Sequence, residues 1–75
     1  MLNIMSPEKL VYQANQIAKF FASQPEAKSV ANILDHLQKY WDPRMRREII
    51  AHAKTNGADF NPRVLSAVRR LTVPN

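Results

Sequence analysis

The chain has no cysteine and only one glycine among its 75 residues. Without cysteine it can form no disulfide, no thiolate metal site and no cysteine nucleophile. Aromatic residues are also scarce, with one Trp, two Tyr and three Phe, so aliphatic side chains must supply most of any core. No apolar run approaches the ~20 residues of a membrane-spanning helix, and the N-terminus lacks a signal-peptide core. We therefore expect a soluble, unprocessed protein in a reducing, cytoplasmic compartment.

Groups that carry out catalysis are not recognisable either. The sequence shows no carboxylate pair, no nucleophile with an adjacent base and no glycine-rich phosphate loop. His36 and His52 fall on different predicted helices without clustered carboxylates, so we predict no metal site. A domain of this size has a small core with little space for an enclosed active site, which makes burial against a partner favourable. The sequence thus assigns no catalytic, cofactor-binding or metal-binding residue.

Positive charge is concentrated in the second half of the chain. The formal net charge is +5 and the pI is about 10.1. Residues 1–41 carry four lysines against three carboxylates, whereas residues 42–75 carry six arginines and one lysine against three carboxylates. Because the planar guanidinium suits bidentate contacts with carboxylate or phosphate, this bias indicates a binding surface. It leaves open whether the target is protein or nucleic acid.

Proline divides the chain into four segments. Four of the five prolines follow a polar residue and precede a run with apolar residues at helical spacing. This is the arrangement expected when the polar residue is an N-cap and proline occupies the first helical position. The predicted helices are approximately residues 7–22, 25–40, 43–56 and 62–72. Residues 1–5 are predicted to be a flexible N-terminus, and Gly57 is predicted to form a left-handed cap after the third helix.

Apolar periodicity supports helices throughout and gives no sign of strands. In the first segment, Leu10, Ala14, Ile17 and Phe21 recur at helical spacing and define one buried face. The neighbouring Phe20 points about 100° away from Phe21, so we predict that it is exposed and available to a partner. Apolar and polar residues nowhere alternate over a useful length. The predicted fold is all-α, a small single domain of four short helices.

The sequence YWDPRMRR at residues 40–47 is the most distinctive stretch of the chain. Because a residue before proline is pushed out of helical geometry, the chain must turn sharply between the second and third helices. Arg44, Arg46 and Arg47 then lie in the first turns of the third helix, where the helix dipole is already positive. An acidic or phosphate-bearing target would explain this placement, and an ordinary solvated face is the simpler alternative.

Three blocks of sequence carry a resemblance to a known family. They are ANQIAKFF at 14–21, HLQKYWDPRMR at 36–46 and NPRVLSAVRRL at 61–71. In this order and with similar separations, they resemble the delta subunit of soluble NAD-dependent formate dehydrogenases. The resemblance covers most of the chain, from about Leu10 to Leu71, and the central block is its most specific part.

The resemblance implies a non-catalytic accessory subunit. In that family the large subunits hold the pterin-bound Mo or W, the iron–sulfur clusters and the FMN, and the delta subunit is associated with stability, cofactor loading or maturation. In our hypothesis Trp41 and Met45 anchor an apolar patch on the large subunits, and the arginines pair with acidic groups there. The predicted partner-binding residues are Phe20, Tyr40, Trp41, Asp42, Arg44, Met45, Arg46 and Arg47.

Several alternatives stand beside this hypothesis. Trp41 lies on the apolar face of the second helix and is equally well explained as a core residue. A small basic helical domain could also bind nucleic acid through a helix-turn-helix. We disfavour this because the third helix offers few base-reading side chains besides its arginines. Self-association of the isolated chain into a homodimer is also left open.

Overall fold

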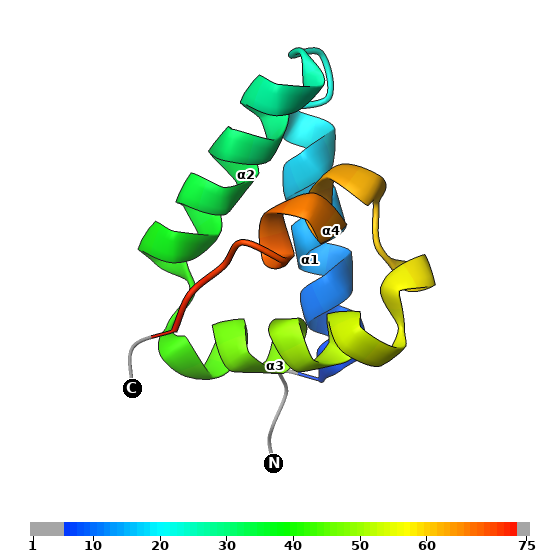
Figure 1. The fold of residues 1–75 in the computed structure, drawn as a ribbon, viewed down its shortest axis with the longest axis vertical. Coiled ribbons are helices and arrows are strands. Elements are labelled where there is room, and N and C mark those ends of the chain that lie inside the picture. The colour runs from blue at the N-terminus through cyan, green and yellow to red at the C-terminus, as the bar shows by residue number, and fades with distance from the viewer. Residues whose placement is uncertain (1–5, 74–75) are drawn as a thin grey trace.

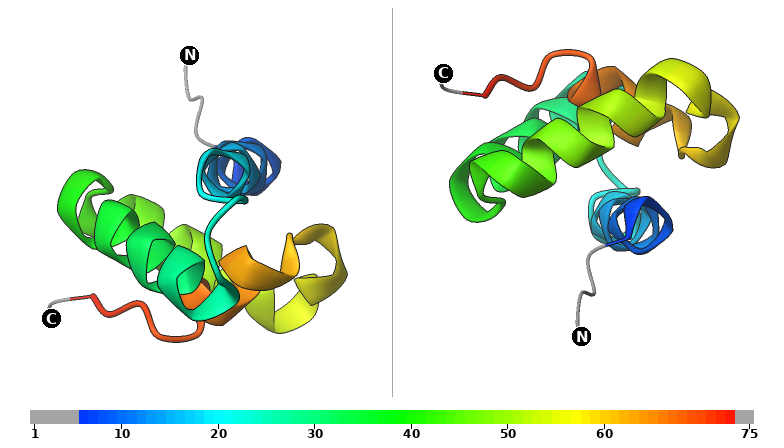
Figure 2. Two further views of the ribbon diagram at one scale, coloured as in Figure 1. Left: turned by 90° about the horizontal axis from the view of Figure 1, so that it is seen from above. Right: turned by 90° about the horizontal axis from the view of Figure 1, so that it is seen from below.

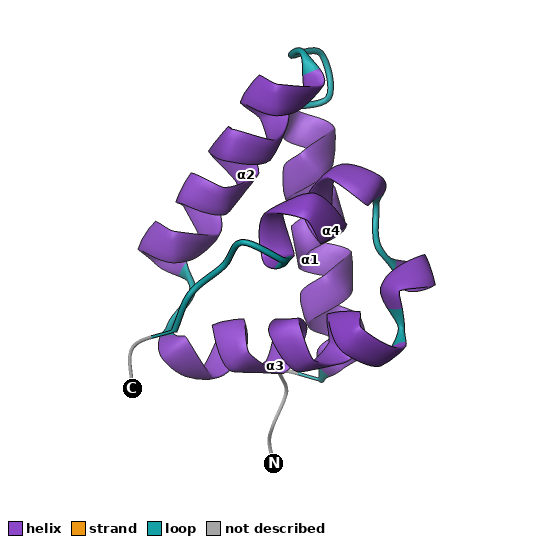
Figure 3. Cartoon of the chain, in the orientation of Figure 1, coloured by secondary structure: helices purple, strands orange, loops and turns teal. Residues whose placement is uncertain are grey.

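The computed structural model describes residues 6–73, and within this range it contains four α-helices and one short 3-10 helix (Figure 1). The elements are α1 (Pro7–Phe20), α2 (Glu26–Tyr40), α3 (Pro43–Thr55), η1 (Gly57–Asp59) and α4 (Pro62–Val68). No strand occurs in the described part of the chain (Figure 3). The predicted all-α fold of four short helices is confirmed. The predicted flexible N-terminus at residues 1–5 lies outside the described residues.

Three helices begin as predicted, with a polar N-cap followed by proline. The Ser6 side chain accepts a hydrogen bond from the Lys9 N–H at 3.3 Å, and Asp42 Oδ1 accepts one from the Met45 N–H at 2.9 Å. Asn61 caps α4 in the same way. These bonds satisfy backbone donors that the first turn of a helix leaves unpaired. Local sequence therefore determines where α1, α3 and α4 start.

The start of α2 differs from this pattern. Pro25 is itself the N-cap, with extended backbone angles, and the helix begins at Glu26. The preceding polar residue, Gln24, does not cap the helix, because its Oε1 accepts a hydrogen bond from Asn32 Nδ2 at 2.7 Å. The α2 start therefore lies one residue later than predicted.

Gly57 and the fourth helix also differ from the predictions. No described residue has a positive φ, so Gly57 is not a left-handed cap. Asn56 ends α3 at negative φ, and Gly57 instead opens η1, which reverses the chain without a left-handed residue. The fourth helix ends at Val68 rather than near residue 72, because the Arg70 and Leu71 N–H groups bond three residues back, to Ala67 O at 3.0 Å and Val68 O at 3.1 Å. Residues 71–73 then continue in a non-helical path.

The helices pack around one apolar core. In Figure 2, α1 is seen nearly end-on beside a layer that contains α2, α3 and α4. The pair α2 and α4 makes the most extensive contact. Every α-helix contributes fully buried side chains, each worth on the order of 1.5–3 kcal/mol of burial free energy. The largest apolar ones are Leu10, Ile33, Leu37, Ile49, Val64 and Val68.

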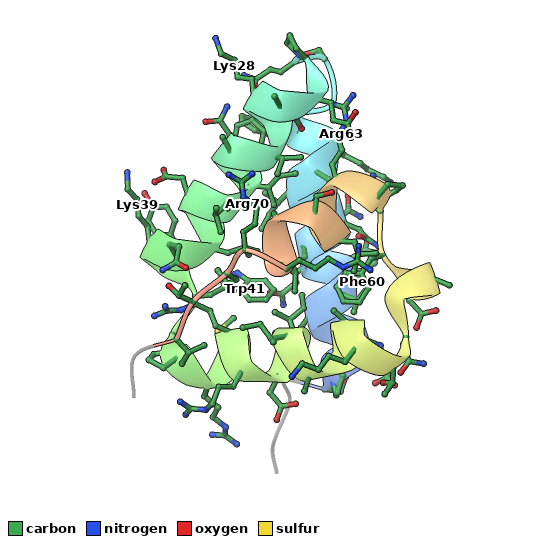
Figure 4. The ribbon with its side chains drawn as sticks, in the orientation of Figure 1. Lys28, Lys39, Trp41, Phe60, Arg63 and Arg70 are labelled. Carbon is green, nitrogen blue, oxygen red and sulfur yellow. The ribbon has the colours of Figure 1, made fainter. Side chains whose placement is uncertain are left out.

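Polar side chains tie the loops to the helices across long sequence separations. Asn15 on α1 donates to Asp59 O at 3.3 Å and accepts from the Asn61 N–H at 3.0 Å. Arg63 on α4 donates to Gln24 O at 2.9 Å in the loop between α1 and α2, and Figure 4 shows it reaching toward that loop. These bonds fix the start of α4 relative to α1 and to the α1–α2 loop. Within residues 6–73, no helix has the length and apolar character to cross a membrane.

Candidate partner-binding site

The corner between α2 and α3 is made by only two residues. Trp41 ends α2, and its N–H donates to Leu37 O at 3.1 Å. Asp42 is extended, with φ −70° and ψ 167°, and it caps α3 immediately before Pro43. The extended geometry before proline produces the sharp turn that the sequence predicts. The corner is therefore rigidly defined by backbone and capping bonds.

Trp41 lies inside the molecule. Its exposed fraction is 6%, and it belongs to the apolar core. Figure 4 shows its ring enclosed between α3 and the C-terminal segment. The core interpretation of Trp41 thus describes this structure, and the predicted direct anchor on a partner is not on the surface. The reason is that its place on the apolar face of α2 turns the indole toward α3 and α4.

Arg46 is also buried, with an exposed fraction of 8%. Its Nε donates to Trp41 O at 2.8 Å and its Nη1 donates to Thr72 O at 2.8 Å. Gln38 Oε1 accepts from both the N–H and the hydroxyl of Thr72, at 2.9 and 3.1 Å. Arg46 and Gln38 therefore fasten the C-terminal segment across the corner. Arg46 does not face outward as the hypothesis supposed, because its Nε and Nη1 donate to carbonyl groups of its own chain, and a direct contact with a partner stays a prediction.

The remaining predicted residues of the block reach solvent to different degrees. Tyr40 is 71% exposed and its ring packs on His36 with centroids 4.8 Å apart. Arg44 and Arg47 are exposed, and no carboxylate of residues 6–73 lies within ion-pair distance of either guanidinium. Met45 is half-buried and packs against the core.

We call Tyr40, Asp42, Arg44 and Arg47 the corner surface. All four side chains are exposed in this structure, although the Asp42 carboxylate also caps α3. Half of the eight predicted partner-binding residues are therefore exposed within eight residues of sequence at the α2–α3 corner. Whether a partner uses them stays a prediction.

Phe20 lies away from the corner surface. It is 81% exposed, which confirms its predicted exposure, and its ring meets Phe21 edge-on with centroids 5.1 Å apart. It ends α1 at the opposite end of the molecule from the α2–α3 corner (Figure 1). Sequence reasoning missed a second exposed aromatic on the same helix, Tyr12, which is 65% exposed. The signal was available, because Tyr12 and Phe20 are eight residues apart and share a face outside the apolar stripe.

The two histidines remain separate in space and in sequence. His36 packs on Tyr40, whereas His52 Nε2 lies 3.4 Å from Asp59 Oδ2. In the part of the chain that the structure describes, no three His, Asp or Glu side chains are grouped so that they could hold a metal ion.

The sequence that forms these helices matches a known protein family. A family model described as NADH-dependent formate dehydrogenase delta subunit FdsD matches residues 9–68. The matched region runs from the first turn of α1 to the last residue of α4, so it includes the α2–α3 corner. Comparisons with curated proteins and with solved structures gave no match. The resemblance seen in the three sequence blocks is confirmed, and the chain belongs to the FdsD family of formate dehydrogenase delta subunits.

Proposed function

We propose that this chain is a non-catalytic accessory subunit that binds the large subunits of a formate dehydrogenase and supports assembly, stability or cofactor loading. The observation that carries the proposal is the family match over residues 9–68. In this proposal the pterin-bound Mo or W, the iron–sulfur clusters and the FMN belong to the partner subunits. Cysteine, the usual ligand of iron–sulfur clusters, does not occur in the chain. Location in the cytoplasm and self-association of the isolated chain stay predictions.

The corner surface and the separate Phe20 are the exposed parts of the predicted site, and the corner surface holds its charged residues. Tyrosine and arginine are enriched among the residues that dominate binding energy at protein interfaces. Arg44 and Arg47 stand at the positive end of α3, where the helix dipole disfavours them. A carboxylate of a partner would relieve that repulsion and accept charge-assisted hydrogen bonds. Trp41 and Arg46 contribute from inside, because they hold the two helices that present these side chains.

Affinity purification tests the proposal. The tagged chain is recovered from its native cells at moderate and at high salt, and the accompanying proteins are identified by mass spectrometry. We expect the large formate dehydrogenase subunits to be retained at high salt. The paired substitution Arg44→Gln with Arg47→Gln, and separately Tyr40→Ala, should lower their recovery by about tenfold, equivalent to ~1.4 kcal/mol of binding free energy. Lys28→Gln, on the exposed first turns of α2 at the far end of the molecule (Figure 4), is the matched control.

Two outcomes would contradict the proposal. Recovery of no large subunit with the unchanged chain would overturn the accessory-subunit function. Recovery of nucleic acid that is lost as salt rises would assign the arginines to phosphate, because phosphate-led binding weakens steeply with salt. Trp41→Ala is not a suitable binding probe, since it removes a core side chain and would unfold the domain before it reported on a partner.

A further inference from the structure

An apolar groove with two cations at its rim lies between α3 and the chain that follows α4. Its volume is about 190 Å³. Its lining residues come from the second half of α3, the end of α4 and the start of the C-terminal segment. They are Ile50, Ala53, Lys54, Val68, Arg69 and Leu71, and we call this site the α3 groove.

The α3 groove is large enough for a side chain. An apolar cavity of roughly 150 Å³ in another protein accommodates a benzene molecule, so a groove of this volume has room for one large aliphatic or aromatic group. Four of its six lining residues are apolar. A side chain inserted there would be removed from water against Ile50, Val68 and Leu71, and this gives the groove a hydrophobic contribution to binding.

The rim of the groove selects the charge of what binds. Lys54 and Arg69 are both exposed, and the lining contains no carboxylate. In residues 6–73, no Asp or Glu oxygen lies within ion-pair distance of either cation. Two free cations beside an apolar floor complement a segment that carries carboxylates next to an apolar side chain. A phosphate backbone would satisfy the cations but leave the apolar floor exposed.

The groove is continuous with the corner surface along α3. Arg47, Ile50 and Lys54 are spaced three and four residues apart, so they follow one another along the same flank of the helix. A single extended or helical segment lying on this flank could meet Arg47 at one end and Lys54 at the other. Arg47 and Lys54 on this flank therefore connect the corner surface with the α3 groove.

The far wall of the groove is held in place before anything binds. Leu71 precedes Thr72, whose carbonyl accepts one hydrogen bond from Arg46 and whose N–H and hydroxyl both donate to Gln38 Oε1. These bonds keep the C-terminal segment against the core, where Leu71 is 7% exposed. A wall that is already ordered lowers the conformational entropy lost on binding. Ordering this wall is one consequence of the hydrogen bond from Arg46 to Thr72 O.

We propose that the α3 groove binds an acidic segment of a large formate dehydrogenase subunit, with an apolar side chain in the groove and carboxylates on Lys54 and Arg69. This inference rests on the proposed accessory function and specifies the chemistry of its contact. A second copy of the chain is a poorer occupant, because each copy carries a net charge of +5 and the two would repel.

Carbodiimide cross-linking of the purified complex tests the proposal directly, because this reagent joins an amine to a carboxylate in contact with it. We expect Lys54 to be linked to an Asp or Glu of a large subunit, in a segment with an adjacent apolar residue. Lys28, exposed at the far end of the molecule, serves as the control and should give no such link. Lys54→Arg should keep the large subunits bound while abolishing the link.

Charge reversal provides the second measurement. The paired substitution Lys54→Glu with Arg69→Glu should lower recovery of the large subunits by about tenfold. Arg70→Glu reverses a neighbouring exposed cation that does not line the groove, and should change recovery by less than about twofold. Thermal unfolding of each variant checks whether the fold is kept. The Lys54→Arg cross-linking result decides the question even if the reversed pair unfolds.

The outcomes separate this inference from the proposed function. If the unchanged chain retains the large subunits but Lys54 gives no link and the reversed pair binds equally well, the groove proposal is overturned and the accessory function stands. Links from Lys54 only to a second copy of the chain would also overturn it, by assigning the groove to self-association. If the unchanged chain retains no large subunit, both the accessory function and the groove proposal fall.

Discussion

Substitution of Arg46 by methionine removes the guanidinium but keeps an unbranched apolar stem of good helix propensity. The change deletes the hydrogen bonds to Trp41 O and Thr72 O, both 2.8 Å long. The Trp41 carbonyl is then left buried without its donor, at about 1–3 kcal/mol, whereas Thr72 is exposed and its carbonyl can turn to water, at about 0.5–1.5 kcal/mol. We therefore expect Arg46→Met to lower the free energy of unfolding by about 3 kcal/mol.

A loss of this size is large for so small a domain. At ~0.05–0.15 kcal/mol per residue, a chain of this length has a total stability of about 4–11 kcal/mol. Each kcal/mol shifts the Tm of a domain of 60–100 residues by roughly 4–8 °C, so the expected fall in Tm is on the order of 12–24 °C. Urea unfolding of the isolated chain, followed by circular dichroism, measures the free energy of unfolding.

Arg47→Met is the matched control, because Arg47 is the next residue on α3, is exposed and makes no side-chain hydrogen bond or ion pair within residues 6–73. Arg47→Met should change the free energy of unfolding by no more than ~0.5 kcal/mol. If Arg46→Met and Arg47→Met have the same effect on the isolated chain, the reasoning from the buried hydrogen bonds is refuted. A double-mutant cycle with Gln38→Met adds a further check, since both side chains hold Thr72 and their effects should not add.

Three smaller predictions follow from single contacts. Ser29 is fully buried and its hydroxyl has no hydrogen-bond partner among the described residues, so Ser29→Ala should raise the free energy of unfolding by about 1 kcal/mol. A lower free energy of unfolding would show that the hydroxyl does make a hydrogen bond. Gly57 has negative φ, and a Cβ there would meet Leu65 at 3.5 Å, an ordinary contact, so Gly57→Ala should raise the free energy of unfolding by about 0.4–1 kcal/mol. Strong destabilisation would instead show that Gly57 adopts the left-handed cap conformation. Asp42→Ala removes the acceptor of the Met45 N–H and should cost about 1 kcal/mol, whereas an unchanged Tm would mean that the cap is not formed.

The candidate site shows how far sequence reasoning reaches. The corner itself was predictable, because Asp-Pro acts on the backbone next to it. The exposure of Phe20 was predictable from helical geometry alone. The burial of Arg46 was not predictable, because one of the two carbonyl groups that accept its hydrogen bonds belongs to Thr72, 26 residues away. A guanidinium among exposed arginines gives no local sign that it faces carbonyl groups of its own chain.

Each of the three sequence blocks of the family resemblance contains a residue that makes a long-range internal contact. Asn15 in the first block holds the chain around η1, Gln38 in the second holds the C-terminal segment, and Arg63 in the third binds the α1–α2 loop. Each of the three blocks therefore contributes a side chain that joins separate parts of the chain.

Local residues by themselves determined four helices and most of their ends, because N-caps, proline and apolar periodicity act within a few residues of where they stand. The sequence also determined the family, which matches over residues 9–68. Only the tertiary structure decided that Trp41 is core, that Arg46 fastens the C-terminal segment and that Lys54 and Arg69 flank one groove. The physical reason is that burial and hydrogen-bond partners are properties of surfaces in contact. Which surfaces meet depends on the packing of helices that are distant in the sequence.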